Sequence, residues 1–277
     1  MPNVIIFGET GAGKSSVINM LEGDKQASVS DKATGVTFSN IRYEKTIRGS
    51  IYSVFDTVGL NEGALGTVSP RTAIEQLYKL MLQLSDGVHL LVYVMRAPRI
   101  TSVAEQNYTM FFDIFCDQKV PIVALITGLE DRDDDMDGWW TENEKVFEGH
   151  NMSFKGHACI TATRGKLKGE TYSYAAEYET SKDRVESLIL DSCAEEPWVM
   201  PTRTWFASTV IRMRNIFATF LGIEPTVLAN ELYRALRSYG ELSDREARKK
   251  AKEIEKSSIK RGLSRLPFAG WKRKMIR

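Results

Sequence analysis

Residues 8–15 constrain the fold of this chain more than any other stretch, because they match the phosphate-binding loop pattern G-x-x-x-x-G-K-[ST] at every defined position. The apolar run 4–7 before the loop is typical of a buried strand, and residues 15–21 carry apolar side chains at helical spacing. Glycines in such a loop let backbone N–H groups converge on phosphate oxygens at a helix N-terminus. We therefore predict a phosphate site formed by Gly8, Glu9, Thr10, Gly11, Ala12, Gly13, Lys14, Ser15 and Ser16.

A second motif follows a predicted β-hairpin. Residues 38–47 and 51–55 carry apolar side chains in imperfect alternation on either side of a turn, which predicts an antiparallel pair at a sheet edge. The second strand ends in Asp56-Thr57-Val58-Gly59. By itself this D-x-x-G pattern is a common turn, but downstream of a phosphate loop it predicts a contact with a bound nucleotide.

The two motifs supply groups with distinct expected roles. Lys14 would reach the β- and γ-phosphates, and the Ser15 hydroxyl would be a ligand of Mg²⁺. Asp56 would orient the Mg²⁺ shell, since carboxylate oxygens are ligands that this ion prefers. The Gly59 N–H would contact the γ-phosphate.

Strands and helices alternate through the next hundred residues. Further strands are predicted at 89–95, 120–126 and 158–163, and helices at 71–84, 101–115, 139–147 and 173–193. This alternation predicts a three-layer α/β fold, a P-loop NTPase domain whose mostly parallel sheet has helices on both faces. Lys14, Asp56, Thr127 and Thr161 then all fall at the carboxyl ends of strands or just after them, which predicts one nucleotide site. We place this domain at residues 1–198 and a helical extension at 199–277.

At this point the sequence resembles the GTP-binding domain of the translation-factor-related GTPases, over roughly residues 3–195. Within that class it is most similar to the septin, immunity-associated and chloroplast-import branch, and especially to uncharacterised fungal G domain-containing proteins. The segments that carry the resemblance are the phosphate loop 8–16, Gly35-Val36-Thr37, Asp56 to Leu60, Met95 to Arg99, Ile126 to Glu130, and the pair Trp139-Trp140.

The resemblance implies a GTP/GDP site with Mg²⁺. By it, Thr37 is the switch threonine that closes over Mg²⁺ and the γ-phosphate, with Thr34 as the alternative. Thr161-Ala162 matches the base-contacting loop, in which the Ala162 N–H would meet guanine O6. Thr127 and Glu130 belong to the segment that recognises the base.

Two departures from the family pattern bear on function. Thr127-Gly128-Leu129-Glu130 stands where the family has Asn/Thr-Lys-x-Asp. Glu130 therefore offers the carboxylate on a longer stem, and Gly128 lacks the lysine whose stem, in the family, covers the base. We expect guanine preference to be weaker, and ATP remains open. Leu60 stands where Ras-like switches have the glutamine that orients water, so unassisted hydrolysis is expected to be slow. Dimerisation, a partner or another residue would supply the missing group.

The C-terminal third has a distinct charge. Residues 245–277 hold 13 Lys/Arg and 3 Asp/Glu, a net of +10, whereas residues 1–244 are net −9. Phe268 and Trp271 alternate with cations near the end, which favours an anionic membrane or another polyanion; a solvated tail or contact with the acidic body stays open. The apolar spacing of residues 204–221 predicts an amphipathic helix. This helix would dock on the nucleotide domain, bind a membrane surface or mediate self-association.

The three cysteines show no metal-ligand spacing, so we expect a reduced, cytoplasmic chain, peripheral to a membrane if the tail binds one.

Three functions are compatible with these features. The first is a nucleotide-dependent switch or assembly GTPase, a slow GTP hydrolase with switch loops at 24–37 and 57–72, which could form a homodimer through its nucleotide face. The second is a P-loop ATPase or small-molecule kinase. The third is a scaffold that binds a nucleotide with little or no hydrolysis, which Leu60 and Gly128 favour.

Overall fold

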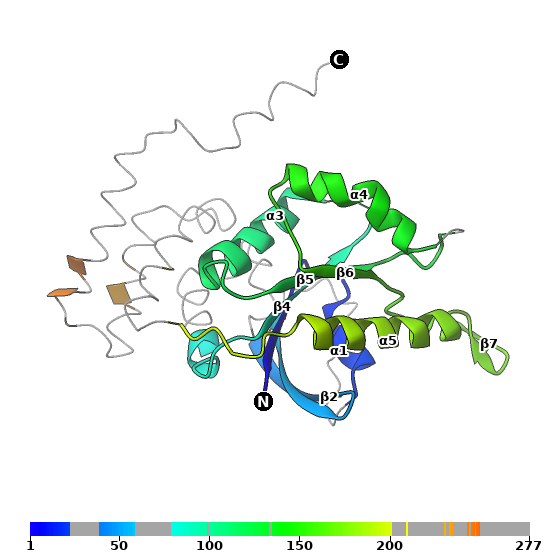
Figure 1. Cartoon of the computed structure of the whole chain (residues 1–277), viewed down its shortest axis with the longest axis horizontal. Helices are drawn as coiled ribbons and strands as arrows, with labels where there is room; N and C mark the ends of the chain where they lie inside the picture. Colours follow the sequence, from blue (N-terminus) through cyan, green and yellow to red (C-terminus); the bar gives the residue numbers. More distant parts are fainter. Residues whose placement is uncertain are drawn as a thin grey trace, which may run out of the picture.

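The computed structural model describes residues 1–22, 39–58, 79–98, 100–132 and 135–200, with isolated residues of the C-terminal part. A six-stranded sheet in the order β2-β3-β1-β4-β5-β6 forms its centre (Figure 1). Only β2 runs antiparallel to its neighbour, and the other described pairs in this sheet are parallel. The strands are β1 (Asn3–Phe7), β2 (Ser39–Ile47), β3 (Ser50–Val58), β4 (Leu90–Arg96), β5 (Ile122–Thr127) and β6 (Gly156–Cys159).

The inner strands are apolar on both faces, as expected for parallel strands covered by helices on both sides. All five residues of β1 and all six of β5 are buried, and β4 is buried up to Met95. Alternate residues enter two separate cores: Ile5 and Phe7 belong to one, and Val4 and Ile6 to the other. The hydrophobic effect therefore fixes β1 at the centre of the sheet and orients both of its faces.

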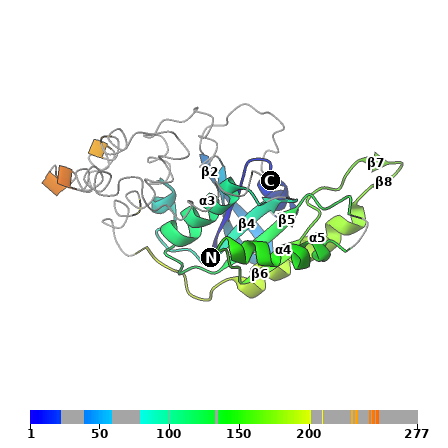
Figure 2. The same ribbon diagram turned by 90° about the horizontal axis from the view of Figure 1, so that it is seen from above.

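Helices cover the two faces as the sequence predicts (Figures 1 and 2). One face packs against α1 (Lys14–Met20) and α5 (Ala175–Ser192), whose buried apolar residues share a core with Val4 and Ile6. The other face packs against α3 (Ser102–Tyr108), η2 (Thr109–Phe115) and α4 (Asp137–Gly149). The three-layer α/β fold with a mostly parallel sheet is thus confirmed.

Three local features can be compared with the sequence analysis. The hairpin is confirmed, with β2 at the edge of the sheet and paired antiparallel to β3. The helix predicted over 101–115 is two segments, because its second half, η2, has π-helical hydrogen bonding. The spacing of apolar residues alone does not distinguish α-helical from π-helical hydrogen bonding. A small hairpin, β7 (Leu167–Lys168) with β8 (Thr171–Tyr172), was not predicted because two-residue strands carry no periodic pattern.

The segment after α5 returns to the start of β4. Trp198 and Val88 form an isolated antiparallel bridge in which each N–H donates to the other's carbonyl at 2.9 Å.

Beyond residue 200, most of the predicted helices and the basic tail lie outside the described residues, so the domain boundary at 198 stays a prediction. Ser243 and Glu246 form a capping box, in which the Ser243 N–H donates to Glu246 Oε2 at 3.0 Å. None of the helices in the described ranges has both the length and the apolar character needed to cross a membrane.

Candidate functional site

The phosphate loop connects β1 directly to α1, and its backbone requires glycine at specific positions. Gly8 has φ +148° and lies so close to β4 that a Cβ there would be 2.0 Å from the Val94 carbonyl oxygen. Gly13 has φ +99° and is the N-cap residue of α1. Side chains at either position would strain or displace the backbone, so the two glycines hold the loop closely between β4 and α1.

The Lys14 side chain lies inside the curve of this loop. It is only 7% exposed, and its ammonium group donates to the carbonyl oxygens of Gly8 and Glu9, each at 2.9 Å. Within the loop, the Ala12 N–H donates to the Glu9 carbonyl at 3.1 Å. The cation is therefore held at the place where the loop would meet the phosphates of a ligand.

Two threonines from neighbouring loops anchor the phosphate loop. The Thr127 hydroxyl, at the end of β5, donates to the Ala12 carbonyl at 2.7 Å, and Thr127 is 2% exposed. The Thr101 hydroxyl donates to the Glu9 carboxylate, and the same oxygen caps α3 by accepting from the Ala104 N–H at 3.0 Å. Sequence analysis assigned Thr127 to base recognition and missed Thr101, although its place just before an apolar helical run is a signal for an N-cap.

Asp56 lies beside the start of the same loop. It is 1% exposed and stands opposite Ile6 in the parallel register of β3 and β1. The next hydroxyl, of Thr57, donates to the Ile6 carbonyl at 3.1 Å, which ties the two strands together there. Asp56 and Ser15, in the first turn of α1, offer a carboxylate and a hydroxyl, the hard oxygen ligands that suit Mg²⁺. The other predicted switch residues, Thr34, Thr37, Gly59 and Leu60, lie outside the described residues.

The two predicted base-contacting loops follow the neighbouring strands β5 and β6. Glu130 is half-buried and follows Leu129, which is buried in the core. Thr161 is buried, and its N–H donates to the Ser181 hydroxyl of α5 at 2.9 Å. Among the described residues, no group accepts from the N–H of Ala162, so this donor remains available to a ligand.

A tyrosine that sequence analysis did not single out connects these loops. The Tyr174 hydroxyl donates to Asp131 Oδ1 at 2.7 Å, and its N–H donates to the Arg164 carbonyl at 3.0 Å. The hydrogen bond to Asp131 raises the pKa of Tyr174, and the Glu130 charge contributes to the same shift. Tyr174 follows the small β7–β8 hairpin, so this insertion brings the ring back to the loop after β5.

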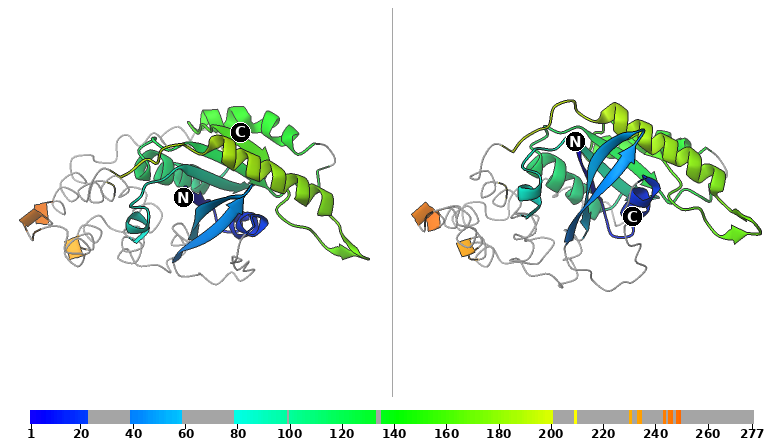
Figure 3. Two further views of the ribbon diagram at one scale, coloured as in Figure 1. Left: turned by 60° about the horizontal axis from the view of Figure 1, so that its bottom comes forward. Right: turned by 90° about the horizontal axis from the view of Figure 1, so that it is seen from below.

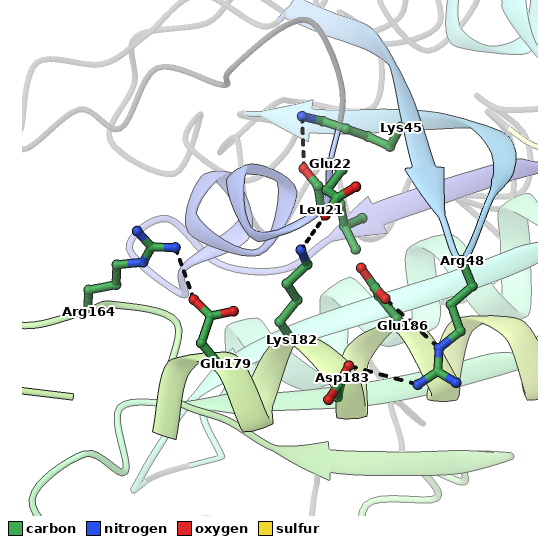
Figure 4. A network of polar contacts seen from close by, with 9 residues as sticks. All are labelled: Leu21, Glu22, Lys45, Arg48, Arg164, Glu179, Lys182, Asp183 and Glu186. Atoms are coloured by element: carbon green, nitrogen blue, oxygen red, sulfur yellow. Dashed lines mark hydrogen bonds and ion pairs between the residues drawn. The ribbon is translucent and has the colours of Figure 1, made fainter. Parts of the chain in front are cut away.

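Helix α5 contacts three separate parts of the chain through a row of charged side chains (Figure 4). Arg164 of the loop after β6 pairs with Glu179 at 3.0 Å and lies 4.8 Å from the Tyr178 ring centroid. Lys182 pairs with Glu22 at 2.8 Å, where α1 ends. At the turn of the β2–β3 hairpin, Arg48 lies 3.9 Å from Glu186; Figure 3 shows this hairpin beside α5. Exposed pairs such as Arg164 with Glu179 contribute little energy each. Together the pairs connect α5 with the loop after β6, the end of α1 and the turn of the β2–β3 hairpin.

Comparison with known proteins identifies the family. The sequence profile of the AIG1 family matches residues 2–153, more than half of the chain. The chain belongs to the AIG1 family. The fold, a mostly parallel sheet with the phosphate loop between β1 and α1, is accordingly that of a P-loop GTPase domain.

Two curated relatives and one solved structure illustrate the extent of the similarity. "Immune-associated nucleotide-binding protein 10" of Arabidopsis thaliana is 30% identical over 136 residues, which cover 48% of this chain and 29% of that protein. "tRNA modification GTPase MnmE" of Hydrogenovibrio crunogenus is 27% identical over 175 residues, 61% of this chain and 34% of that protein. The crystal structure of Era in complex with MgGDPNP and a segment of 16S ribosomal RNA has 18% identity and a TM-score of 0.48, covering 80% of this chain and 68% of that one.

These matches confirm the resemblance to immunity-associated proteins. A fungal origin and a relationship to septins or chloroplast-import GTPases stay predictions. The chain spans about a third of the length of the two curated relatives. The activities that their names state are therefore said of those proteins and not of this chain.

Proposed function

We propose that this chain binds GTP with Mg²⁺ and works as a nucleotide-dependent switch or assembly GTPase that hydrolyses GTP slowly to GDP. The observation that carries the proposal is the Lys14 ammonium, enclosed by the carbonyls of Gly8 and Glu9 in a glycine loop at the N-terminus of α1. A buried cation in a glycine loop at a helix N-terminus is suited to a chain of phosphates. The phosphates would contact residues 8–16.

Three side chains would hold Mg²⁺: Ser15, Asp56 and Thr37. Ser15 and Asp56 fit this role because both offer oxygen atoms beside the phosphate loop. Thr37 is included from the resemblance of Gly35-Val36-Thr37 to a switch segment. When bound, Mg²⁺ would neutralise charge on the β- and γ-phosphate oxygens. In the same site, Lys14 would contact those phosphates and the Gly59 N–H the γ-phosphate.

Base recognition would come from the loops after β5 and β6. A carboxylate at Glu130 can accept hydrogen bonds from both N1–H and N2–H of guanine, whereas adenine N1 is itself an acceptor. The N–H of Ala162 would donate to guanine O6, with Thr161 held by α5. Thr127 would contribute indirectly, because its hydroxyl fixes the phosphate loop through the Ala12 carbonyl.

Slow hydrolysis is proposed from Leu60, an apolar side chain that cannot orient an attacking water. The isolated chain is expected to hydrolyse GTP at or below the rate of an unstimulated small GTPase, on the order of 10⁻⁴ s⁻¹. A rate that rises with protein concentration would support a homodimer through the nucleotide face. Fast hydrolysis at high dilution would contradict the role given to Leu60.

The decisive experiment identifies the nucleotide that co-purifies with the chain and measures its affinity. Chromatography of the denatured protein should show GDP or GTP, and calorimetry should show tighter binding of GDP than of ADP. Equal binding of both would favour the ATPase or kinase alternative. Guanine nucleotide bound tightly without measurable turnover would favour the scaffold alternative.

The basic segment 245–277 is proposed to bind anionic membrane, which would place a cytoplasmic protein at a membrane periphery. Its net charge of +10 would attract anionic headgroups, while Phe268 and Trp271 insert between lipids. Sedimentation with anionic vesicles at low salt should pellet the full chain but not a version ending at Asp244. If both stay in the supernatant, the membrane proposal is wrong; binding of RNA alone would make the tail a nucleic-acid contact.

A further inference from the structure

Arg96, the last residue of β4, lies directly against Gly128. The two strands place Arg96 opposite Thr127 in the sheet, and the Ala97 N–H donates to the Thr127 carbonyl at 2.9 Å. A Cβ at Gly128 would be 2.9 Å from Arg96 Cγ and 3.2 Å from both Nε and Cζ. The whole length of the arginine side chain therefore covers the position where a side chain at residue 128 would begin.

The backbone explains why residue 128 does not supply this side chain itself. Gly128 has φ +78°, a conformation that residues with a Cβ rarely adopt. Glycine relieves this strain and leaves open the volume that Arg96 fills. The missing side chain at 128 and the presence of Arg96 are thus two parts of one arrangement.

Arg96 has a positive charge without a described partner. It is exposed, and among residues that the structure describes its guanidinium makes no hydrogen bond, ion pair or contact over an aromatic ring. Most other arginines near this site are committed: Arg132 pairs with Glu142 and Arg164 with Glu179. An exposed cation that rests on Gly128, and whose donors have no partner among the described residues, is available to a ligand.

The position of Arg96 indicates which part of the ligand it would contact. Thr127 binds the phosphate loop through Ala12, and Glu130 lies three residues further along. Arg96 rests on Gly128, between these two points, while Lys14 already occupies the phosphate loop. A purine whose edge is held at Glu130 would present its flat face to the residues in between. A planar guanidinium stacks well on such a face.

We propose that Arg96 stacks on the face of the bound purine and replaces, from β4, the base-covering side chain that Gly128 cannot provide. This inference rests on the proposed nucleotide site and adds a residue that determines its affinity for the base.

The test compares GDP with a ligand that has no base. In Arg96→Ala, the affinity for GDP is expected to fall about tenfold, the size of a well-placed cation–aromatic contact. The inhibition constant of magnesium pyrophosphate, measured by competition with fluorescent GDP, should stay as in the wild type. Arg96→Lys keeps the positive charge but lacks the planar guanidinium, so its affinity for GDP should lie between those of Arg96→Ala and the wild type. Lys119→Ala removes an exposed cation just before β5, at the end of that strand opposite Thr127; it is the matched control and should change neither constant.

A second pair of variants tests the contact with Gly128. Gly128→Ala would displace Arg96, so it should weaken GDP binding, and a thermal unfolding curve shows how much backbone strain it adds. In an Arg96→Ala background, the same Gly128→Ala change should weaken GDP binding less than in the wild type, since the contact is already lost.

The outcomes separate this inference from the function on which it rests. Wild-type protein that binds no GDP would overturn the proposed function. Wild-type binding together with unchanged GDP affinity in Arg96→Ala would overturn the role of Arg96 alone. An equal loss for GDP and pyrophosphate would also overturn it, because Arg96 would then act on phosphate.

Discussion

The phosphate half and the base half of the candidate site are built in different ways. The phosphate half is one continuous segment, Gly8 to Ser16, in which local backbone geometry and Lys14 create the shape. The base half is assembled from the loop after β5, the loop after β6, Tyr174 and the charged row of α5. A segment formed by local contacts tolerates little change in sequence, whereas an assembled surface can exchange one side chain for another from a neighbouring strand. The Gly128 and Arg96 pair is an exchange of this kind.

The largest expected effect tests the phosphate half. Lys14→Ala removes the ammonium group inside the loop, so we expect GTP and GDP binding to fall below detection by calorimetry. The loss should be the same whichever base the nucleotide carries. Because Lys14 also holds the Gly8 and Glu9 carbonyls, the variant's unfolding temperature should be measured alongside. Retained affinity in a folded variant would contradict the phosphate-loop assignment. Lys119→Ala serves again as the control.

The second prediction concerns the base half and should change specificity more than affinity for phosphate. Glu130→Ala removes the proposed acceptor for guanine N1–H and N2–H. The ratio of GDP to ADP affinity should fall about 10- to 100-fold, the cost of leaving polar groups of the base unpaired. Competition assays with both nucleotides measure it, with Glu148→Ala, an exposed carboxylate of α4, as the control. An unchanged ratio would mean that another group discriminates the base.

The third prediction tests the junction between the halves. Thr127→Val keeps the shape of the side chain but removes the hydroxyl that donates to the Ala12 carbonyl at 2.7 Å. Leaving this buried carbonyl unpaired should cost about 1–3 kcal/mol of stability, measured by urea unfolding, and should weaken GDP and ADP binding alike. Thr127→Ser retains the donor and should stay close to the wild type. Loss of stability without loss of nucleotide affinity would show that the two halves are not coupled through Thr127.

The smallest expected effect tests the support that α5 gives to the base half. Glu179→Ala removes the partner of Arg164 in an exposed pair, for which the expected contribution is small. GDP affinity should change less than about threefold, and the change should shrink further at high salt because exposed charges are screened. A tenfold loss would mean that the charged row of α5 shapes the base loop more strongly than its exposure indicates.

Sequence reasoning predicted the position of the glycine loop between β1 and α1, while its binding of phosphate stays a prediction. Its donors lie within a few consecutive residues, and the glycines that shape the loop are visible as glycines. The parallel sheet was predictable for a similar reason, since strands buried on both faces are continuous apolar runs such as those of β1 and β5. Asp56 was expected just after the strand 51–55. Because β3 continues to Val58, Asp56 lies near its carboxyl end, opposite Ile6 of β1.

The sequence by itself therefore determined the fold class, the phosphate loop and the place of Asp56 along the chain. Only the tertiary structure decided which side chains meet around the loop after β5: Arg96 on Gly128, Tyr174 on Asp131, and Thr127 turned toward Ala12. These contacts join residues about 30 to 115 positions apart, and they depend on β4 lying between β1 and β5 in the sheet. No local spacing encodes that order, because the burial of apolar faces along the whole chain selects it.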